Sequence, residues 1–273
     1  GWKLLVSSLI DTTYRDLRSL IIGKVYTPAM LGYYNRGQQF PQLVISNING
    51  SIQAVMLPAL AAQQDYTERV KSMMRRSIVT SSFIVFPMMV GLAVVAEPLV
   101  VLLLTDKWLP AVPFLQIFCF SYALWPIHTA NLQAINAMGR SDIYLKLEIV
   151  KKIVGLAILF ISLPFGVYYL ALSEIVSTIA SAFINAYPNK NLLDYGYAEQ
   201  MKDILPSLLL SLVMGVIVYF FSFFGLSLLV TMVLQILAGV VIYVLLALLF
   251  RLECFHYLIH TVISLFKDRR QTT

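Results

Sequence analysis

The sequence predicts an all-α bundle of membrane-spanning helices, and three observations support this fold class. Of the 273 residues, 59% are hydrophobic and only 12% are charged, about half the charged share of a soluble domain. The apolar residues form segments of about 20 residues, long enough to cross a hydrocarbon layer roughly 30 Å thick. Barrel strands would instead need about 10 residues of strict alternation. The composition therefore excludes a soluble enzyme, a disordered chain and a disulfide-rich scaffold.

Proline, glycine and charged residues mark the limits of about eight predicted spans. A tight turn at Pro164 and Gly166 separates the fifth span from the sixth, and Gly225 separates the seventh from the eighth. The predicted spans cover residues 4–25, 31–60, 77–96, 112–138, 144–163, 168–187, 204–224 and 226–250.

Lysine and arginine are unevenly distributed between the two sides of this predicted bundle. An even number of spans puts both termini on one side, and basic residues of membrane proteins accumulate on the cytoplasmic side. Both termini and the basic tail, residues 251–273, are therefore predicted to be cytoplasmic. The same rule accounts for the net charge of +6, so no nucleic-acid partner is expected. The basic residues on the side of the termini are Arg69, Lys71, Arg75, Arg76, Arg140, Lys190, Lys202, Arg251, Lys267, Arg269 and Arg270, against Lys24, Arg36 and Lys107 opposite.

Polar residues recur at three- and four-residue steps in the first two spans, so each span has one continuous hydrophilic face. Such faces extend over about four turns and must meet water, another protein surface or a polar substrate. The stripe of the first span consists of Ser8, Asp11, Thr12, Arg15, Arg18 and Ser19, and that of the second of Arg36, Gln39, Gln42, Ser46, Asn49 and Gln53.

Charged residues also occur inside the fifth and sixth spans, at Glu148, Lys152 and Glu174. Glu148 and Lys152 are spaced i to i+4 in the favoured acid-first direction, as are Asp11 and Arg15. Charges inside a membrane usually pair. Mutual neutralisation within the bundle is therefore as good an interpretation as a functional role.

The last two spans differ from the others, because no charged residue lies between Ile204 and Phe250 and Gln235 is the only side-chain amide there. These spans are predicted to face lipid or an acyl chain. Hydrophilic early spans beside apolar late ones suggest an amphipathic substrate with a polar head and a lipid tail. The alternative is a bundle held together by polar contacts between helices, with peripheral lipid-facing helices.

The chain carries no catalytic motif: no Walker loop, HExxH, GxSxG or dinucleotide fingerprint occurs. His128, His256 and His260 are not spaced as a metal site, and Cys119 and Cys254 form no CxxC pair. No enzyme activity, metal or cofactor is therefore expected.

Several segments resemble the C-terminal half of Wzx-type polysaccharide exporters. They are LGYYNRGQQFP at residues 31–41, SNING at 46–50, AEPLVVLLLTDKWLPAVPFLQI at 96–117, NAMGRSD at 136–142 and KLEIVKK at 146–152. These exporters are lipid-linked oligosaccharide flippases of the multidrug/oligosaccharidyl-lipid/polysaccharide superfamily, and the colanic acid or exopolysaccharide branch is the most similar. The resemblance implies a fourteen-helix transporter of two six-helix lobes and two final helices.

In this comparison the eight spans correspond to helices seven to fourteen. Residues 1–200 would form the second lobe, residues 201–250 the two additional helices, and residues 251–273 the cytoplasmic tail. The first lobe would be missing from this chain and supplied by the same or a separate polypeptide. Because the family's substrate cavity lies between the lobes, the resemblance implies that Arg15, Arg18 and Arg36 hold the diphosphate, with Gln39 and Asn49 as further substrate-binding residues. Asp11, Asp16, Glu148, Lys152 and Glu174 are candidates for ion coupling or for structural charges.

The predicted function is the transfer of an undecaprenyl-diphosphate-linked oligosaccharide across the bacterial inner membrane by alternating access. A drug or cation antiporter of the same superfamily is the first alternative, although several arginines favour an anionic lipid substrate. A membrane glycosyltransferase or polymerase is the second alternative. It usually needs a sizeable outer loop for its catalytic groups, and the predicted outer connections do not much exceed about 15 residues.

Overall fold

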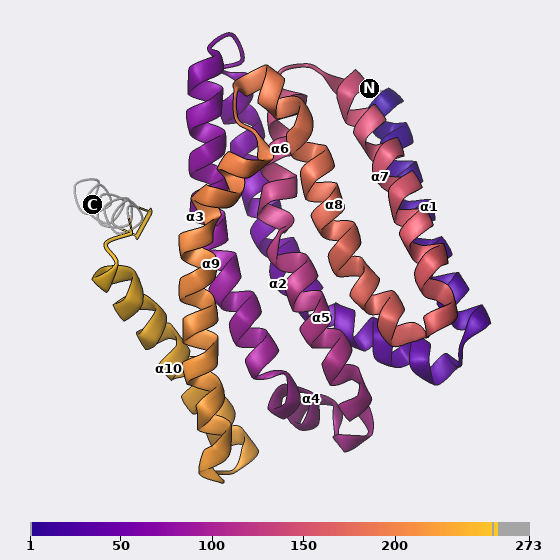
Figure 1. The fold of residues 1–273 in the computed structure, drawn as a ribbon, viewed down its shortest axis with the longest axis vertical. Coiled ribbons are helices and arrows are strands. Elements are labelled where there is room, and N and C mark those ends of the chain that lie inside the picture. The colour runs from indigo at the N-terminus through magenta and orange to yellow at the C-terminus, as the bar shows by residue number, and fades with distance from the viewer. Residues whose placement is uncertain (1, 253, 256–273) are drawn as a thin grey trace, which may run out of the picture.

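The structure is a computed structural model that describes residues 2–252, 254 and 255, with the backbone alone for residues 2–4, 7, 10, 11 and 15–18. Every regular element in these residues is helical, which confirms the all-α fold class. Figure 1 shows long helices that run roughly along one direction. They are α1 (Trp2–Val25), α2 (Pro28–Ala61), α3 (Thr67–Val94), α4 (Ala96–Leu104), α5 (Val112–Ala123), α6 (Trp125–Ala137), α7 (Ser141–Ser162), α8 (Val167–Leu193), α9 (Tyr197–Tyr219) and α10 (Leu228–Leu249).

Within the described residues, six helical segments are long and apolar enough to cross a membrane, so the chain is a multi-pass membrane protein. They correspond to α2, α3, α5 with α6, α8, α9 and α10. Helices α1 and α7 form where the first and fifth spans were predicted, but neither is among the six. In α7, Lys146, Glu148, Lys151 and Lys152 lower the hydropathy. The number of eight spans therefore stays a prediction.

Local sequence signals explain where several helices begin and end. Thr27 caps α2, because its side-chain oxygen accepts a hydrogen bond from the Met30 N–H at 3.3 Å, and Pro28 occupies the first turn, where no N–H partner is needed. The predicted fourth span is interrupted at Leu124, just before Pro126, which the sequence analysis did not anticipate. Gly225, with a φ of 64°, permits the turn between α9 and α10.

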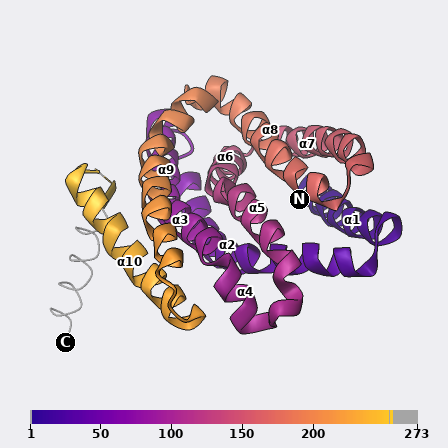
Figure 2. The ribbon, with the colours of Figure 1, turned by 60° about the horizontal axis from the view of Figure 1, so that its bottom comes forward.

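Helices α5 and α6 form the interior of the bundle. They pack against α2, α3 and α8, whereas α1 packs against α7, and α3 packs along α9. The end-on view in Figure 2 shows α5 and α6 surrounded by α2, α3 and α8, with α1 and α7 at one edge and α10 at the other. Helix α2 thus has one face on the interior helices and leaves the opposite face uncovered.

Helix α10 lies at the edge of the bundle and is attached along a single stripe. Its buried residues recur at every fourth position: Thr231, Gln235, Gly239, Tyr243 and Ala247. The Tyr243 hydroxyl donates a hydrogen bond to the Phe83 carbonyl oxygen of α3 at 2.9 Å, and Gln235 Nε2 donates to the Ser222 hydroxyl at 2.9 Å. The remaining surface of α10 is apolar and exposed, as the sequence predicted.

Buried amides connect three helices near one end of the bundle. Asn131 of α6 and Gln200 of α9 exchange two side-chain hydrogen bonds of 2.8 and 3.0 Å, and Asn189 of α8 donates to Asn131 Oδ1 at 2.7 Å. All three side chains are fully buried. Because a buried amide without partners is costly, these bonds fix the relative positions of the three helices.

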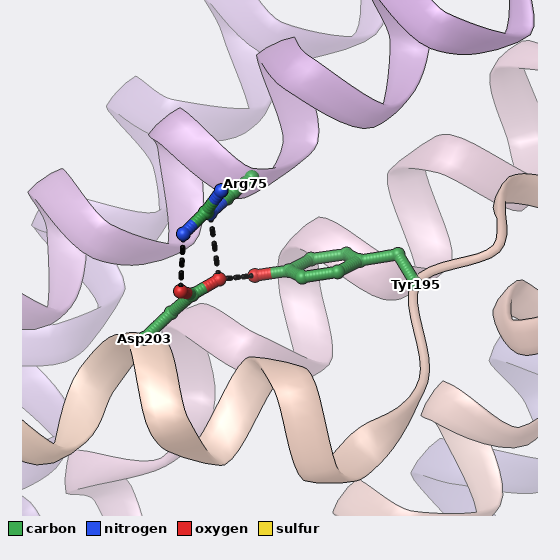
Figure 3. A network of polar contacts seen from close by, with 3 residues as sticks. All are labelled: Arg75, Tyr195 and Asp203. Atoms are coloured by element: carbon green, nitrogen blue, oxygen red, sulfur yellow. Dashed lines mark hydrogen bonds and ion pairs between the residues drawn. The ribbon is translucent and has the colours of Figure 1, made fainter.

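At the same end, Asp203 of α9 joins α3 to the connection before α9 (Figure 3). Arg75 donates two hydrogen bonds to the two carboxylate oxygens at 2.8 and 2.7 Å, and the Tyr195 hydroxyl donates to Asp203 Oδ2 at 2.6 Å. Burial and the Asp203 carboxylate both raise the pKa of Tyr195, so its hydroxyl stays protonated and remains a donor. The two-pronged arginine contact gives this junction a defined geometry.

We expect Gly37→Ala to destabilise the bundle, because a Cβ at Gly37 would lie 2.5 Å from Phe114 Cβ and 2.7 Å from the Leu115 backbone nitrogen of α5. The clash involves backbone and should cost about 1–3 kcal/mol. Gly50→Ala on the same helix is the matched control, since nothing lies within 4 Å of its Cβ position; it should be neutral or slightly stabilising. Thermal unfolding in detergent measures both, and equal midpoints would contradict the close approach of α2 to α5.

Candidate functional site

A polar cavity of about 530 Å³ lies among α1, α2, α5, α6, α7 and α8. Each of these helices contributes side chains that can form hydrogen bonds, so the cavity is suited to a hydrophilic occupant rather than to an apolar one. Its polar and charged lining residues are Ser8, Tyr14, Gln38, Asn49, Gln53, Ser121, Tyr122, Trp125, His128, Thr129, Gln133, Tyr144, Glu148, Lys151, Lys152, Glu174, Ser177, Thr178 and Ser181.

Among the side chains that the structure describes, the charged residues lining the cavity come from α7 and α8. Glu148 forms an ion pair with Lys151 at 2.5 Å, and both side chains are almost buried. The i to i+4 spacing predicts a pair of Glu148 with Lys152, but the ammonium of Lys152 lies 4.7 Å from the centre of the Tyr14 ring of α1. Glu174 lines the cavity from α8. Within the described part of the chain, two carboxylates and two ammonium groups line this cavity.

Tyr14 lies close to a glycine in the cavity wall. A Cβ at Gly155 of α7 would lie 2.7 Å from the Tyr14 hydroxyl oxygen, so a larger residue there would require the Tyr14 side chain to shift. The Tyr14 ring in turn provides the aromatic face over which Lys152 lies. The close approach of α1 to α7 thus places an aromatic ring and an ammonium group side by side.

A second hollow, of about 560 Å³, shares one lining residue, Gln38, with the first cavity. Arg36 Nη1 donates a hydrogen bond to Gln39 Oε1 at 2.6 Å, and its guanidinium lies 5.5 Å from the centre of the Trp108 ring. Trp108 comes from the 3₁₀ helix Asp106–Ala111, which follows α4. The lining residues of this outer hollow, as we call it, are Gly32, Asn35, Arg36, Gln38, Gln39, Gln42 and Trp108.

The predicted site residues fall into three groups in the structure. Asn49, Glu148, Lys152 and Glu174 line the polar cavity, whereas Arg36 and Gln39 line the outer hollow. The side chains of Asp11, Arg15, Asp16 and Arg18 lie outside the described residues. No observation tests whether any of these residues binds substrate or an ion, so their roles stay predictions.

Several lining residues lie outside the predicted polar stripes, among them Gln38, Lys151 and Trp108. Gln38 is off the exposed stripe of α2, and its Nε2 donates a hydrogen bond to the Tyr122 hydroxyl at 2.7 Å. Lys151 belongs to the segment KLEIVKK, but the i to i+4 rule favours Lys152 as the partner of Glu148. Trp108 has no sequence signal that connects it to α2, because the contact is a tertiary one.

Comparisons with known proteins agree with the resemblance seen in the sequence. Residues 1–113 match the family described as "Polysaccharide biosynthesis protein". The lipopolysaccharide biosynthesis protein WzxC of Escherichia coli is 26% identical over 229 residues, covering 80% of this chain and 46% of WzxC. The teichuronic acid biosynthesis protein TuaB of Bacillus subtilis is 24% identical over 139 residues, covering 51% of this chain and 29% of TuaB.

The chain is thus similar in sequence to WzxC and to TuaB. It spans less than half the length of the two named here. Among solved structures, the lipid II flippase MurJ in an inward closed conformation superposes with a TM-score of 0.73 and 17% sequence identity, covering 92% of this chain and 52% of MurJ. This likeness shows that the chain has the fold of about half of that flippase.

We expect the polar cavity to contain water and therefore to admit a charged thiol reagent. In a background with Cys119 and Cys254 replaced by alanine, Ser177→Cys in the cavity wall of α8 should react, because the reactive thiolate forms only in a hydrated environment. The neighbouring Val176→Cys is the control: its side chain is exposed on the outer apolar surface and would face lipid. Rates of labelling in intact membranes decide the question, and equal rates at both positions would contradict a hydrated cavity.

Proposed function

We propose that this chain forms the second lobe of a transporter that moves an undecaprenyl-diphosphate-linked oligosaccharide across the bacterial inner membrane. The observation that carries the proposal is the polar cavity inside a helical membrane bundle, adjoining the uncovered polar face of α2. The fold shared with the lipid II flippase MurJ and the similarity to WzxC support it.

The two ends of such a substrate have opposite solvent requirements. A sugar head cannot enter hydrocarbon without losing its hydrogen bonds to water, which costs several kcal/mol for each unsatisfied polar group. The side chains of the polar cavity would replace those bonds. The undecaprenyl chain would stay against the apolar exposed surfaces of α9 and α10, where lipid-like contacts are available.

In this proposal the transport step breaks no covalent bond and proceeds by alternating access. A first lobe of six helices, in the same or a separate polypeptide, would close the uncovered side of α2. Arg15, Arg18 and Arg36 would attract the diphosphate, with Gln39 and Asn49 as further contacts. The pairing of Glu148 with Lys151 supports a structural role for Glu148, whereas Asp11, Asp16, Lys152 and Glu174 are the remaining candidates for ion coupling.

The charge of the site favours an anionic substrate over the cationic drug of the alternative antiporter. In the polar cavity the carboxylates of Glu148 and Glu174 are offset by the ammonium groups of Lys151 and Lys152. The outer hollow adds the guanidinium of Arg36, and no carboxylate is among its lining residues. A cation would therefore meet no excess of negative charge in the described part of either hollow.

Export of surface polysaccharide in a flippase-deficient strain tests the proposal. The chain expressed with a six-span first lobe should restore export, and Arg36→Ala should reduce export at least about tenfold at unchanged membrane abundance, since it removes a charge-assisted contact to the diphosphate. Arg69→Ala is the matched control: Arg69 also lies over a ring, 4.8 Å from the centre of Tyr66, but lines neither hollow. Normal export by the Arg36 variant would contradict substrate binding there, and rescue by the chain alone would contradict the need for a first lobe.

We further propose that both termini are cytoplasmic, with Lys107 on the periplasmic side and Arg140 on the cytoplasmic side, as the distribution of basic residues predicts. Lys107 lies beside α4 and Arg140 directly before α7. Single cysteines at the two positions should react with an impermeant reagent from opposite sides of the membrane. Labelling of both from the same side would reject this orientation.

A further inference from the structure

A third hollow, of about 570 Å³, lies where α3, α9 and the segment after α10 meet. We call it the junction hollow, because Arg75 and Asp203 of the junction in Figure 3 form part of its wall. None of the described residues that line it also lines the polar cavity or the outer hollow. The junction hollow is therefore separate from the proposed substrate site.

Two neighbouring arginines of α3 line the junction hollow. Arg75 donates two hydrogen bonds to the carboxylate of Asp203, yet its side chain is 60% exposed. Arg76 is exposed as well. Asp203 is itself held by the Tyr195 hydroxyl, which donates a hydrogen bond to it at 2.6 Å. The carboxylate thus fixes one guanidinium at the rim, and among the described lining residues two guanidinium groups stand against one carboxylate.

The lining changes from polar to apolar along α3. Ser72 and Arg76 lie near the beginning of the helix, and Val79 follows on the same face one turn later. From the other side, Leu252 and Cys254 line the hollow and pack against the buried apolar cluster between α3, α9 and α10. The junction hollow therefore has a charged rim and an apolar inner wall, which suits an amphipathic occupant.

Apolar side chains are exposed next to the junction hollow. Leu205 and Leu209 of α9 lie within one turn of Pro206, which lines it, and Leu249 and Phe250 are exposed at the end of α10. Both α3 and α9 belong to the segments that can cross a membrane. A hollow near the beginning of both helices lies at the depth where lipid headgroups meet hydrocarbon.

We propose that the junction hollow binds the headgroup of an anionic glycerophospholipid with one phosphate, of the phosphatidylglycerol type. Arg75 and Arg76 bind the phosphate oxygens, and the hydroxyls of Ser72 and Thr80 bind the glycerol head. The acyl chains lie along Leu205 and Leu209. This inference goes beyond the proposed function, because the lipid is a component of the membrane and is not transported.

The chemistry of the lining favours this occupant over three others. A zwitterionic headgroup would bring its ammonium group close to two guanidinium groups, which repel it. A soluble phosphate would leave the apolar inner wall and the exposed leucines without contacts. The diphosphate of the proposed substrate carries a large sugar head, and the polar cavity that would receive this head shares no described lining residue with the junction hollow.

Protection of Cys254 from alkylation tests the site in the purified chain, because this thiol lines the hollow and is partly exposed. Cys119→Ala leaves Cys254 as the only cysteine. We expect phosphatidylglycerol in detergent micelles to slow the reaction with N-ethylmaleimide in a saturable way. Half-maximal protection should need about one tenth of the concentration of phosphatidylethanolamine with the same acyl chains, the difference expected of one charge-assisted contact. Equal protection by both lipids, or no saturable protection by phosphatidylglycerol, would overturn the proposal.

A charge substitution shows whether the protection depends on the rim. Arg76→Gln should raise the half-protective concentration of phosphatidylglycerol about tenfold, to that of phosphatidylethanolamine. Arg69→Gln is the matched control, because Arg69 is an exposed arginine of the same helix but does not line the hollow. An equal loss in both variants would indicate attraction to the basic end of the bundle as a whole and would overturn the site. Phosphatidylglycerol should also raise the thermal unfolding midpoint of the parent chain more than that of the Arg76 variant, since a ligand that binds only the folded state stabilises it.

Glycerol 1-phosphate distinguishes a lipid from a free phosphate. It has the same headgroup chemistry without acyl chains, so it should protect Cys254 at least about tenfold less effectively than the lipid. Protection at the same concentration as phosphatidylglycerol would identify a site for soluble phosphate and overturn the lipid assignment. The export experiment tests the transport function separately, so failure of the lipid site and failure of that function remain distinguishable.

Discussion

The bundle depends on one constraint: helices surrounded by hydrocarbon gain nothing from burying apolar side chains against each other, so close backbone approach and polar contacts must hold them together. Gly37 lets α2 meet the backbone of α5, and Gly215 of α9 would, with a Cβ, lie 2.4 Å from Val90 Cγ1 of α3. The buried amides of Asn131, Asn189 and Gln200 fix α6, α8 and α9. These few contacts determine how the helices are placed relative to one another.

The same constraint explains why the polar cavity and the outer hollow share one side of the molecule. Polar contacts concentrate where helices meet, and α2 can direct only one face towards α5 and α6. The other face keeps Arg36, Gln39 and Ser46 exposed, which in a membrane requires water or a further protein surface. Helix α10 has the opposite character: it is attached by a narrow buried stripe, and the rest of its surface suits acyl chains, as do the exposed apolar residues of α9.

Much of this organisation could be predicted from the sequence, because periodicity and composition are local properties. All residues of the stripe from Arg36 to Gln53 except the buried Asn49 are exposed on α2, and the absence of charge after Ile204 predicted the apolar surface of α10. Prediction failed where two local partners compete, and also where a partner comes from elsewhere in the chain. Glu148 has two lysines within one helical turn, and side-chain geometry rather than spacing selects Lys151.

The sequence by itself determined the fold class, the resemblance to polysaccharide exporters and the polar or apolar character of each helix face, since these depend on residue type and a period of 3.6 residues. Only the tertiary structure decided which stripes meet. It separated Arg36 and Gln39 from Asn49, and it placed Trp108, 72 positions along the chain, over Arg36. The physical reason is that a hollow is formed by the approach of distant helices. Gly37 shows this, since a Cβ there would lie 2.7 Å from the Leu115 backbone nitrogen of α5, a contact that no local pattern contains.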